Sequence, residues 1–213
     1  MRANIENIKA FLIETLNRKG SITLFANYFS RMEENFTKHG LNSELENFIC
    51  TYLSIYSNGE HLKDEELYSY FRDFYLYTAR MKTDENILKH LYRYSNYYLK
   101  ILTLDITDID IKNLVSKIKK IGAVDTYSYL LEVFEDYEFA HINKNTFVDI
   151  LETVVEYVAN RKFSHKKYIP FSALSNELNK MLAMKNYVPQ IDVEPAIPQS
   201  KKITINDLLN QHQ

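Results

Sequence analysis

One stretch of the chain combines positive charge with aromatic side chains and contains no acid. It lies within residues 157–176 and carries four basic residues, Arg161, Lys162, Lys166 and Lys167. Basic residues interleaved with aromatic ones are typical of surfaces that contact nucleic-acid phosphates. The same charges would also offset a helix dipole at a helix C-terminus, or lie in solvent. These four residues are the candidate nucleic-acid-binding residues, and DNA is the candidate partner.

Three acidic residues share one face of a predicted helix near residue 150. Asp149, Glu152 and Glu156 have helical spacing, and carboxylates grouped in this way can bind a divalent metal. Their face lies opposite an apolar stripe, which favours a solvated surface. A second acidic run, at 105–110, lacks the glycine and distal glutamate of a calcium-binding loop, so helix capping explains it better. We predict no metal site and no catalytic residue.

The other reactive residue types form no complete catalytic motif. Residues 19–21 read Lys-Gly-Ser, which is not the order of a phosphate-binding loop. Cys50 is the one cysteine and has no local histidine, which favours a buried or half-buried structural thiol. No cofactor is predicted. The histidines include no pair at metal-ligand spacing, and most are expected in loops or on the surface: His39, His61, His90, His141, His165 and His212.

The composition describes an ordinary globular protein. The chain is 46% hydrophobic and 25% charged with a net charge of -2, so any nucleic-acid surface must be local. Only four Gly and four Pro occur, too few for the turns of a β-rich fold of this size. No signal-like segment or span of about 20 apolar residues is present. Together with the single cysteine, this predicts a cytoplasmic chain without a membrane partner.

Apolar residues recur every three or four positions, which is the pattern of amphipathic helices. Ser43 with Glu46 predicts a capping box, and Asp64 and Thr83 (or Asp84) predict the starts of two further helices. The fold class is therefore all-α, a bundle of eight or nine helices. The apolar stripes cover residues 5–16, 25–36, 45–56, 67–75, 91–102, 114–121, 130–134, 147–158 and 174–182.

The helical pattern extends over residues 1–186, which are predicted to form a helical domain with a subdivision allowed near 104–110. Length alone leaves one or two domains open. Pro189, Pro195 and Pro198 exclude a regular helix beyond that point. Residues 187–213 are predicted to be a C-terminal arm or the remnant of a following domain.

Tyrosine is abundant, with 17 residues. Rows such as Tyr94, Tyr97 and Tyr98 could stack on nucleic-acid bases. Packing of amphipathic helices, with hydroxyls at the edge of the core, is the favoured interpretation.

Several of these blocks occur in a characteristic order. A helix with Phe48, Tyr52 and Leu53 leads through a polar loop to a second block, and a later helix runs to the basic pair at 161–162. In this order the blocks resemble the helical middle of the GmrSD-type, modification-dependent restriction proteins, over most of residues 40–185. The family more often has two arginines at the basic pair. The second block and the aromatic pair that follows it are Leu67, Tyr68 and Phe71, then Tyr97 and Tyr98.

The resemblance also concerns the parts that flank this middle. The family's ParB-like N-terminal half is marked by Asp-Gly-Gln-Gln-Arg, and no such run occurs here. Its C-terminal half is a His-Me finger nuclease, and Pro195 follows Glu194 where that nuclease has its catalytic histidine. Proline cannot accept a proton, so general-base catalysis is excluded there.

The resemblance thus implies a non-catalytic helical scaffold, or a nucleic-acid- or partner-binding module, of a bacterial restriction or anti-phage defence protein. DNA and a nuclease domain or subunit are the implied partners. Two alternatives stay open. One is a metal-dependent nuclease that uses the His-Me finger remnant or the acidic face at 149–156, and the other is a purely protein-binding helical adaptor.

Overall fold

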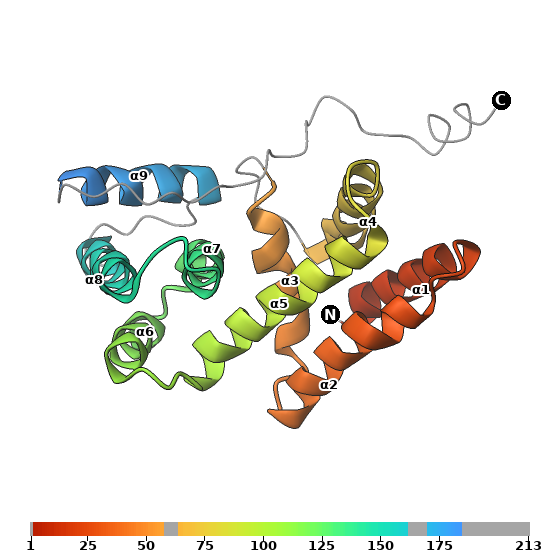
Figure 1. The fold of residues 1–213 in the computed structure, drawn as a ribbon, viewed down its shortest axis with the longest axis horizontal. Coiled ribbons are helices and arrows are strands. Elements are labelled where there is room, and N and C mark those ends of the chain that lie inside the picture. Colours follow the sequence, from red (N-terminus) through yellow and green to blue (C-terminus); the bar gives the residue numbers. More distant parts are fainter. Residues whose placement is uncertain (1, 58–63, 162–169, 185–213) are drawn as a thin grey trace.

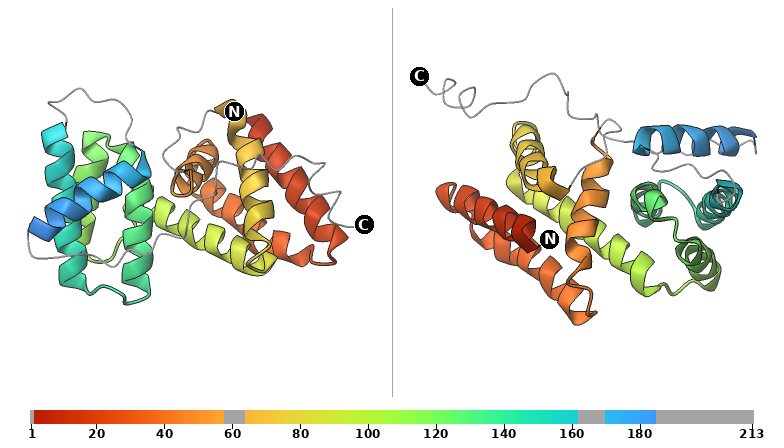
Figure 2. Two further views of the ribbon diagram at one scale, coloured as in Figure 1. Left: turned by 90° about the horizontal axis from the view of Figure 1, so that it is seen from above. Right: turned by 180° about the vertical axis from the view of Figure 1, so that it is seen from behind.

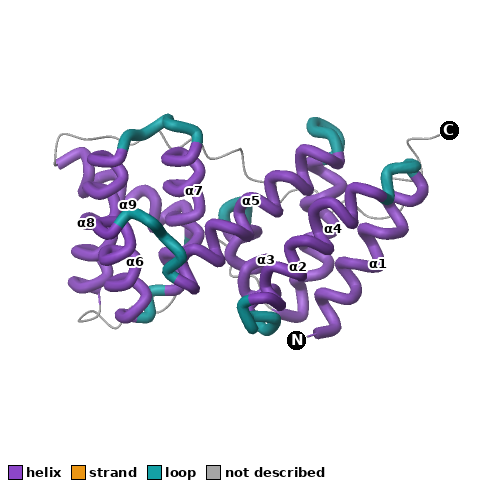
Figure 3. The backbone as a smooth tube through the Cα atoms, turned by 60° about the horizontal axis from the view of Figure 1, so that its bottom comes forward, coloured by secondary structure: helices purple, strands orange, loops and turns teal. Residues whose placement is uncertain are grey.

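The computed structural model describes residues 2–57, 64–161 and 170–184. In these ranges the chain consists of helices and short connections, without a strand (Figure 3). The all-α prediction is confirmed. The described α-helices are α1 (Arg2–Arg18), α2 (Arg31–Lys38), α3 (Glu44–Ser54), α4 (Leu67–Thr78), α5 (Asp84–Thr103), α6 (Ile109–Ile121), α7 (Tyr127–Glu138), α8 (Lys144–Arg161) and α9 (Phe171–Met184).

The helices form two groups joined by the long helix α5 (Figures 1 and 2). In the first group α1 packs on α4, and α2 and α3 pack on α5. In the second group α6 packs along α8, while α9 lies against α7 and α8. Helix α7 contacts both α5 and α3, so the two groups also meet side by side. At this contact Ser95 of α5 and Glu132 of α7 are buried.

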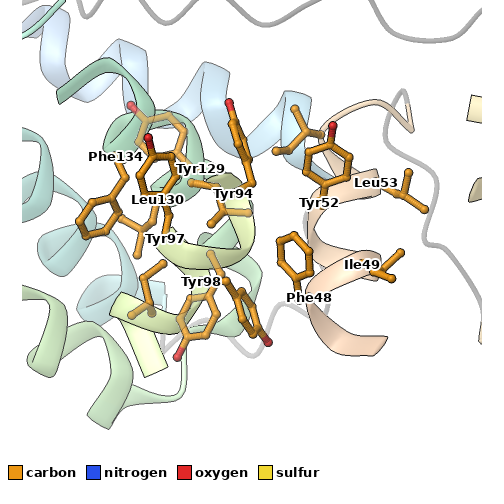
Figure 4. Close-up of a cluster of buried hydrophobic side chains, with 14 of the residues drawn as sticks. Phe48, Ile49, Tyr52, Leu53, Tyr94, Tyr97, Tyr98, Tyr129, Leu130 and Phe134 are labelled. Atoms are coloured by element: carbon orange, nitrogen blue, oxygen red, sulfur yellow. The ribbon is translucent and has the colours of Figure 1, made fainter. Parts of the chain in front are cut away.

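One cluster of buried apolar side chains passes through both groups. Its centre is aromatic, and Figure 4 shows Phe48 and Tyr52 of α3 beside Tyr94 and Tyr98 of α5. The rings of Tyr52 and Tyr94 meet edge to face, with centroids 5.5 Å apart at 83°. Such pairs contribute about 1 kcal/mol beyond their burial. Tyr94, Tyr97 and Tyr98 are all buried. The packing interpretation of these tyrosines is therefore confirmed, and they are not available to stack on bases.

Two helix starts follow the sequence prediction. Thr83 has extended backbone angles, and its hydroxyl accepts a hydrogen bond from the Asn86 backbone N–H at 3.2 Å. Asp108 caps α6 by accepting from the backbone N–H groups of Asp110 and Ile111. The acidic run at 105–110 thus contributes a helix cap, as expected. Each cap satisfies donors that the first helical turn leaves without an intrahelical partner.

Other local predictions were wrong. Ser43 has helical backbone angles (φ −70°, ψ −18°) and makes no capping bond, because the turn before it has already begun. Glu46, the other half of the expected capping box, is buried and accepts a hydrogen bond from Asn4 Nδ2 at 2.7 Å. Asp64 does not cap α4, since a 3-10 turn (Asp64–Glu66) precedes it and Glu66 holds the N-cap position. The second predicted helix begins as a π-helix, Phe25–Ser30.

The junction predicted near 104–110 coincides with the connection between α5 and α6, where Leu104 has a positive φ of 58°. How many independently folding units the chain contains stays a prediction. The arm predicted at 187–213 lies outside the described residues. None of the helices described above combines the length and apolar character needed to cross a bilayer.

Candidate functional site

The basic residues identified in the sequence mostly lie outside the described part of the chain. Arg161 is the last residue of α8. Lys162, Lys166 and Lys167 fall in the range 162–169, which the structure does not describe. The nucleic-acid-binding role of these four residues stays a prediction.

The acidic face of α8 is a solvated surface. Asp149, Glu152 and Glu156 are exposed, whereas Ile150 and Val154 on the opposite face are buried. Within residues 2–57, 64–161 and 170–184, no three His, Cys, Asp or Glu side chains come together in a way that could hold a metal ion. The exposure of these three acids agrees with the favoured interpretation of the face as a solvated surface.

A groove with an uneven charge lies where α3, α4 and α5 meet, close to the C-terminal end of α7. Its volume is about 480 Å³, which is in the range typical of small-molecule sites. Among the described residues, the lining contains the cations Lys82, Lys89 and Arg93 and no acid. We refer to it as the cationic groove. It is lined by Tyr52, Tyr56, Phe74, Thr78, Met81, Lys82, Thr83, Asn86, Ile87, Lys89, His90, Arg93 and Phe139.

His90 forms part of this groove in a fixed orientation. Its Nδ1 is 3.0 Å from the Tyr52 hydroxyl, and its ring stacks on that of Tyr94 with centroids 4.1 Å apart. Burial, together with the nearby charges of Arg93 and Lys82, lowers the pKa of His90 to about 3. The imidazole is therefore neutral at physiological pH, and Nδ1 is occupied by Tyr52. Within the described chain no residue bonds to Nε2, so this nitrogen can serve a ligand.

The cations of the groove influence one another. Burial and the Arg93 charge lower the pKa of the Lys82 ammonium. Lys89 lies on α5 and is exposed. None of the described acids forms an ion pair with it. Like charges brought together in a partly buried groove attract an anion, because the anion relieves their repulsion.

Arg93 is held in place by a carboxylate behind the groove. Its Nε donates to Glu135 Oε2 at 2.7 Å, and its Nη2 donates to the other carboxylate oxygen. The guanidinium carbon also lies 4.9 Å from the ring centroid of Phe139. Burial alone would lower the pKa of Arg93, but the bonds to Glu135 outweigh it and raise the pKa. Arg93 therefore contributes a fixed set of N–H donors, while Lys89 contributes a charge that none of the described acids pairs with.

A row of acids and tyrosines joins α5 to α7 beneath the groove. Tyr94 donates to Glu132 at 2.9 Å, and Tyr97 donates to Glu135 at 2.9 Å. Burial raises the pKa of Glu132 to about 8, with Asp136 and Glu135 acting in the same direction and the Tyr94 bond acting against it. These contacts are internal, so we assign them to the junction of the two helical groups and not to ligand binding.

The groove is better suited to binding than to catalysis. Burial raises the pKa of the Tyr52 and Tyr56 hydroxyls, so both stay protonated at neutral pH. A histidine with a pKa near 3 is a weak general base, since effective bases have pKa values near the working pH. No activated nucleophile is therefore formed by the side chains that line the groove.

The sequence contains only a weak signal for this site. Lys89, His90 and Arg93 lie on one helical face, but they read as the polar face of an amphipathic helix. Most histidines were expected in loops or on the surface, and His90 is an exception, since it is partly buried within α5. Its partner, Tyr52, is 38 positions away on α3, so the pairing has no local pattern.

Comparison with known proteins adds no relative. No protein-family model, curated protein or solved structure matches this chain.

Proposed function

We propose that this chain is a non-catalytic helical module that binds an anionic partner, namely the phosphates of nucleic acid. The observation that carries the proposal is the cationic groove, whose described lining holds Lys82, Lys89 and Arg93 and no acid. The neutral His90 and the protonated tyrosines support binding over chemistry. The order of the sequence blocks at 40–185 supports assignment to a bacterial restriction or anti-phage defence protein.

In this proposal the groove and the basic residues 161–167 contact the same polyanion. Lys89 lies against phosphate oxygens, and Arg93 donates hydrogen bonds from a guanidinium already oriented by Glu135. Preorganised donors lose little side-chain freedom on binding, which favours affinity. Arg161, Lys162, Lys166 and Lys167 add sequence-independent charge that strengthens binding at low salt.

Binding of duplex DNA to the full chain, measured across salt concentrations, tests the proposal. We expect Lys89→Glu to weaken binding at least tenfold and to reduce the slope of log affinity against log salt by about 1. The matched control is Lys117→Glu, which changes an exposed lysine on α6 in the other helical group. Absence of binding at low salt, or equal losses for the two variants, would contradict the proposal.

Residues 161–167 are tested separately. Replacing Lys166 and Lys167 together by Gln should lower the salt slope by about 2 if both contact phosphates. An unchanged slope would remove these residues from the interface. Copurification of a protein partner, with no DNA affinity at any salt concentration, would instead favour the protein-binding adaptor.

A further inference from the structure

The contact between α5 and α7 depends on ionisable side chains. Tyr94 of α5 donates to Glu132 of α7 at 2.9 Å. Three positions further along α7, Glu135 accepts hydrogen bonds from both Arg93 and Tyr97 of α5. The protonation state of these carboxyl groups therefore affects how strongly the two helices are held together.

The contacts of α7 within its own helical group are of a different kind. The rings of Phe134 and Tyr137 pack on Phe147 of α8, with centroids 5.1 and 4.6 Å apart. Phe134 also stacks on Tyr97 of α5, which is the one ring pair that the described residues form between α5 and α7. Helix α7 is therefore joined to α8 by ring packing and to α5 chiefly by hydrogen bonds to carboxyl groups.

Glu132 differs from the next two acids of α7, because no described cation forms an ion pair with it. Glu135 is paired with Arg93, and Asp136 lies 3.1 Å from His141. Glu132 is only 6% exposed. A buried carboxylate without a cation is costly, so this carboxyl keeps its proton while the two helices are in contact.

The groups around Glu132 do not supply a cation for it, since Arg93 is already bonded to Glu135. Within the described chain, α8 and α9 form no hydrogen bond or ion pair with Glu132. Burial raises the pKa of its carboxyl to about 8, and the neighbouring acids act in the same direction. The titratable groups that interact with it are Glu135 and Asp136 of α7, Tyr94 of α5, and Tyr52 and Tyr56 of α3.

We propose that the junction of the two helical groups is a pH-sensitive contact, in which loss of the Glu132 proton to solvent releases α7 from α5 and α3. The ionised carboxylate regains its hydration when the junction opens, and this gain favours the open form. Helices α6, α8 and α9 move with α7, because α6 packs along α8 and α9 lies against α7 and α8. The inference does not depend on nucleic-acid binding.

Hydrogen exchange of the full 213-residue chain between pH 5 and pH 9 tests the proposal, after correction for the intrinsic pH dependence of exchange. We expect the amides of α5 and α7 to exchange at least tenfold faster at pH 9 than at pH 5. The amides of α1 and α6, one helix from each group, should change less than twofold. An equal increase in all four helices would show a loss of global stability and would overturn the inference.

Two variants identify Glu132 as the titrating group. Glu132→Gln should reduce the pH difference in α5 and α7 to less than twofold, because the amide has no proton to lose. Tyr94→Phe removes the donor that favours the ionised form, so the pH above which exchange no longer increases should move upward. A pH dependence that persists in Glu132→Gln, or an unmoved pH in Tyr94→Phe, would contradict the proposal.

The matched control is Glu138→Gln on the same helix. The Glu138 side chain is 56% exposed and lies 3.6 Å from Lys100 of α5. This pair also links α5 to α7, but it is at the surface, where an ion pair contributes little. Glu138→Gln should therefore keep the pH dependence of the unmodified chain. Loss of that dependence in this variant would assign the effect to surface charge and overturn the inference.

Discussion

Two hollows of nearly equal size on this protein carry opposite charge. The cationic groove has a volume of about 480 Å³, and a second hollow, beside α1 to α3, has a volume of about 490 Å³. Its described lining contains Glu6, Glu33 and Glu46 and no base, and we refer to it as the acidic groove. Volume therefore does not distinguish the two grooves. They are compared by whether the charged side chains of each groove are paired within the protein.

The acids of the acidic groove are largely matched from within the protein. Lys9 Nζ lies 3.0 Å from Glu33 and 3.5 Å from Glu6, and Asn4 donates to Glu46 at 2.7 Å. In the cationic groove Arg93 is matched by Glu135, but Lys89 pairs with no described acid. The comparison suggests that the acidic groove serves helix packing, whereas the cationic groove retains charge for a ligand.

The largest expected effect is on the free energy of unfolding. It comes from removing the cation of an ion pair beside each groove, Arg93 with Glu135 and Lys9 with Glu33. Arg93→Met leaves Glu135, whose side chain is 17% exposed, without its cationic partner and with the hydrogen bond from Tyr97. We expect a loss of about 3 kcal/mol in the free energy of unfolding, because an unpaired and poorly solvated carboxylate is costly. Lys9→Met leaves Glu33, whose side chain is more exposed at 27%, so about 1 kcal/mol is expected. Urea denaturation measures both, and equal losses would contradict the distinction.

The next effect concerns the buried acid beneath the cationic groove. The pKa of Glu132 is raised to about 8, so the folded protein retains a proton that the unfolded chain loses at a lower pH. This contribution to stability is present below pH 4.5 and is lost as the pH rises through 8. Glu132→Gln keeps an oxygen that can accept from Tyr94 but has no proton to lose. The free energy of unfolding of this variant, relative to wild type, should therefore be about 2 kcal/mol higher at pH 9 than at pH 5.

The control for this prediction is Glu6→Gln in the acidic groove, since the Glu6 side chain is 68% exposed. Thermal unfolding is measured at pH 5, 7 and 9. The difference in Tm between variant and wild type should depend on pH for Glu132→Gln and should not depend on pH for Glu6→Gln. His90 contributes at the acidic end of this range, in the wild type and in both variants alike, because its lowered pKa makes stability fall as the pH drops below 6.5. A pH-independent effect of Glu132→Gln would show that its carboxyl is not protonated in the folded state.

Charge reversal in each groove tests which of them meets the polyanion. Lys89→Glu should reduce DNA affinity at least tenfold, as stated above, whereas Glu6→Lys should raise it no more than about threefold through long-range attraction alone. Filter binding or fluorescence anisotropy at two salt concentrations distinguishes a contact from a long-range effect. A large gain with Glu6→Lys would assign the interface to the acidic groove instead.

The smallest expected effect is the loss of stability when a hydroxyl at the start of a helix is removed. Each groove contains one such hydroxyl. Thr83 lines the cationic groove and caps α5, whereas Ser43 lines the acidic groove and makes no capping bond to α3. Thr83→Ala should therefore cost about 1 kcal/mol, and Ser43→Ala should cost almost nothing. Chemical denaturation resolves the difference. Equal costs would show that Ser43 caps α3 in solution.

Prediction from the sequence succeeded where a local rule decides the structure. Apolar spacing identified every described α-helix, because a helix must turn one face toward the core. Thr83 and Asp108 were recognisable as caps, since a short polar side chain before a helical stripe satisfies the first turn. Ser43 failed under the same rule because its backbone conformation depends on the preceding turn, which the motif does not report.

The sequence was sufficient for the class of fold and for the inward faces of its helices, since both depend on periodicity along one segment. Tertiary structure alone decided that His90 meets Tyr52, that Arg93 meets Glu135, and that these pairs border one hollow. Their partners lie 38 and 42 positions apart in the chain. Contacts over such separations depend on how whole helices pack, and that packing is a property of the assembled core.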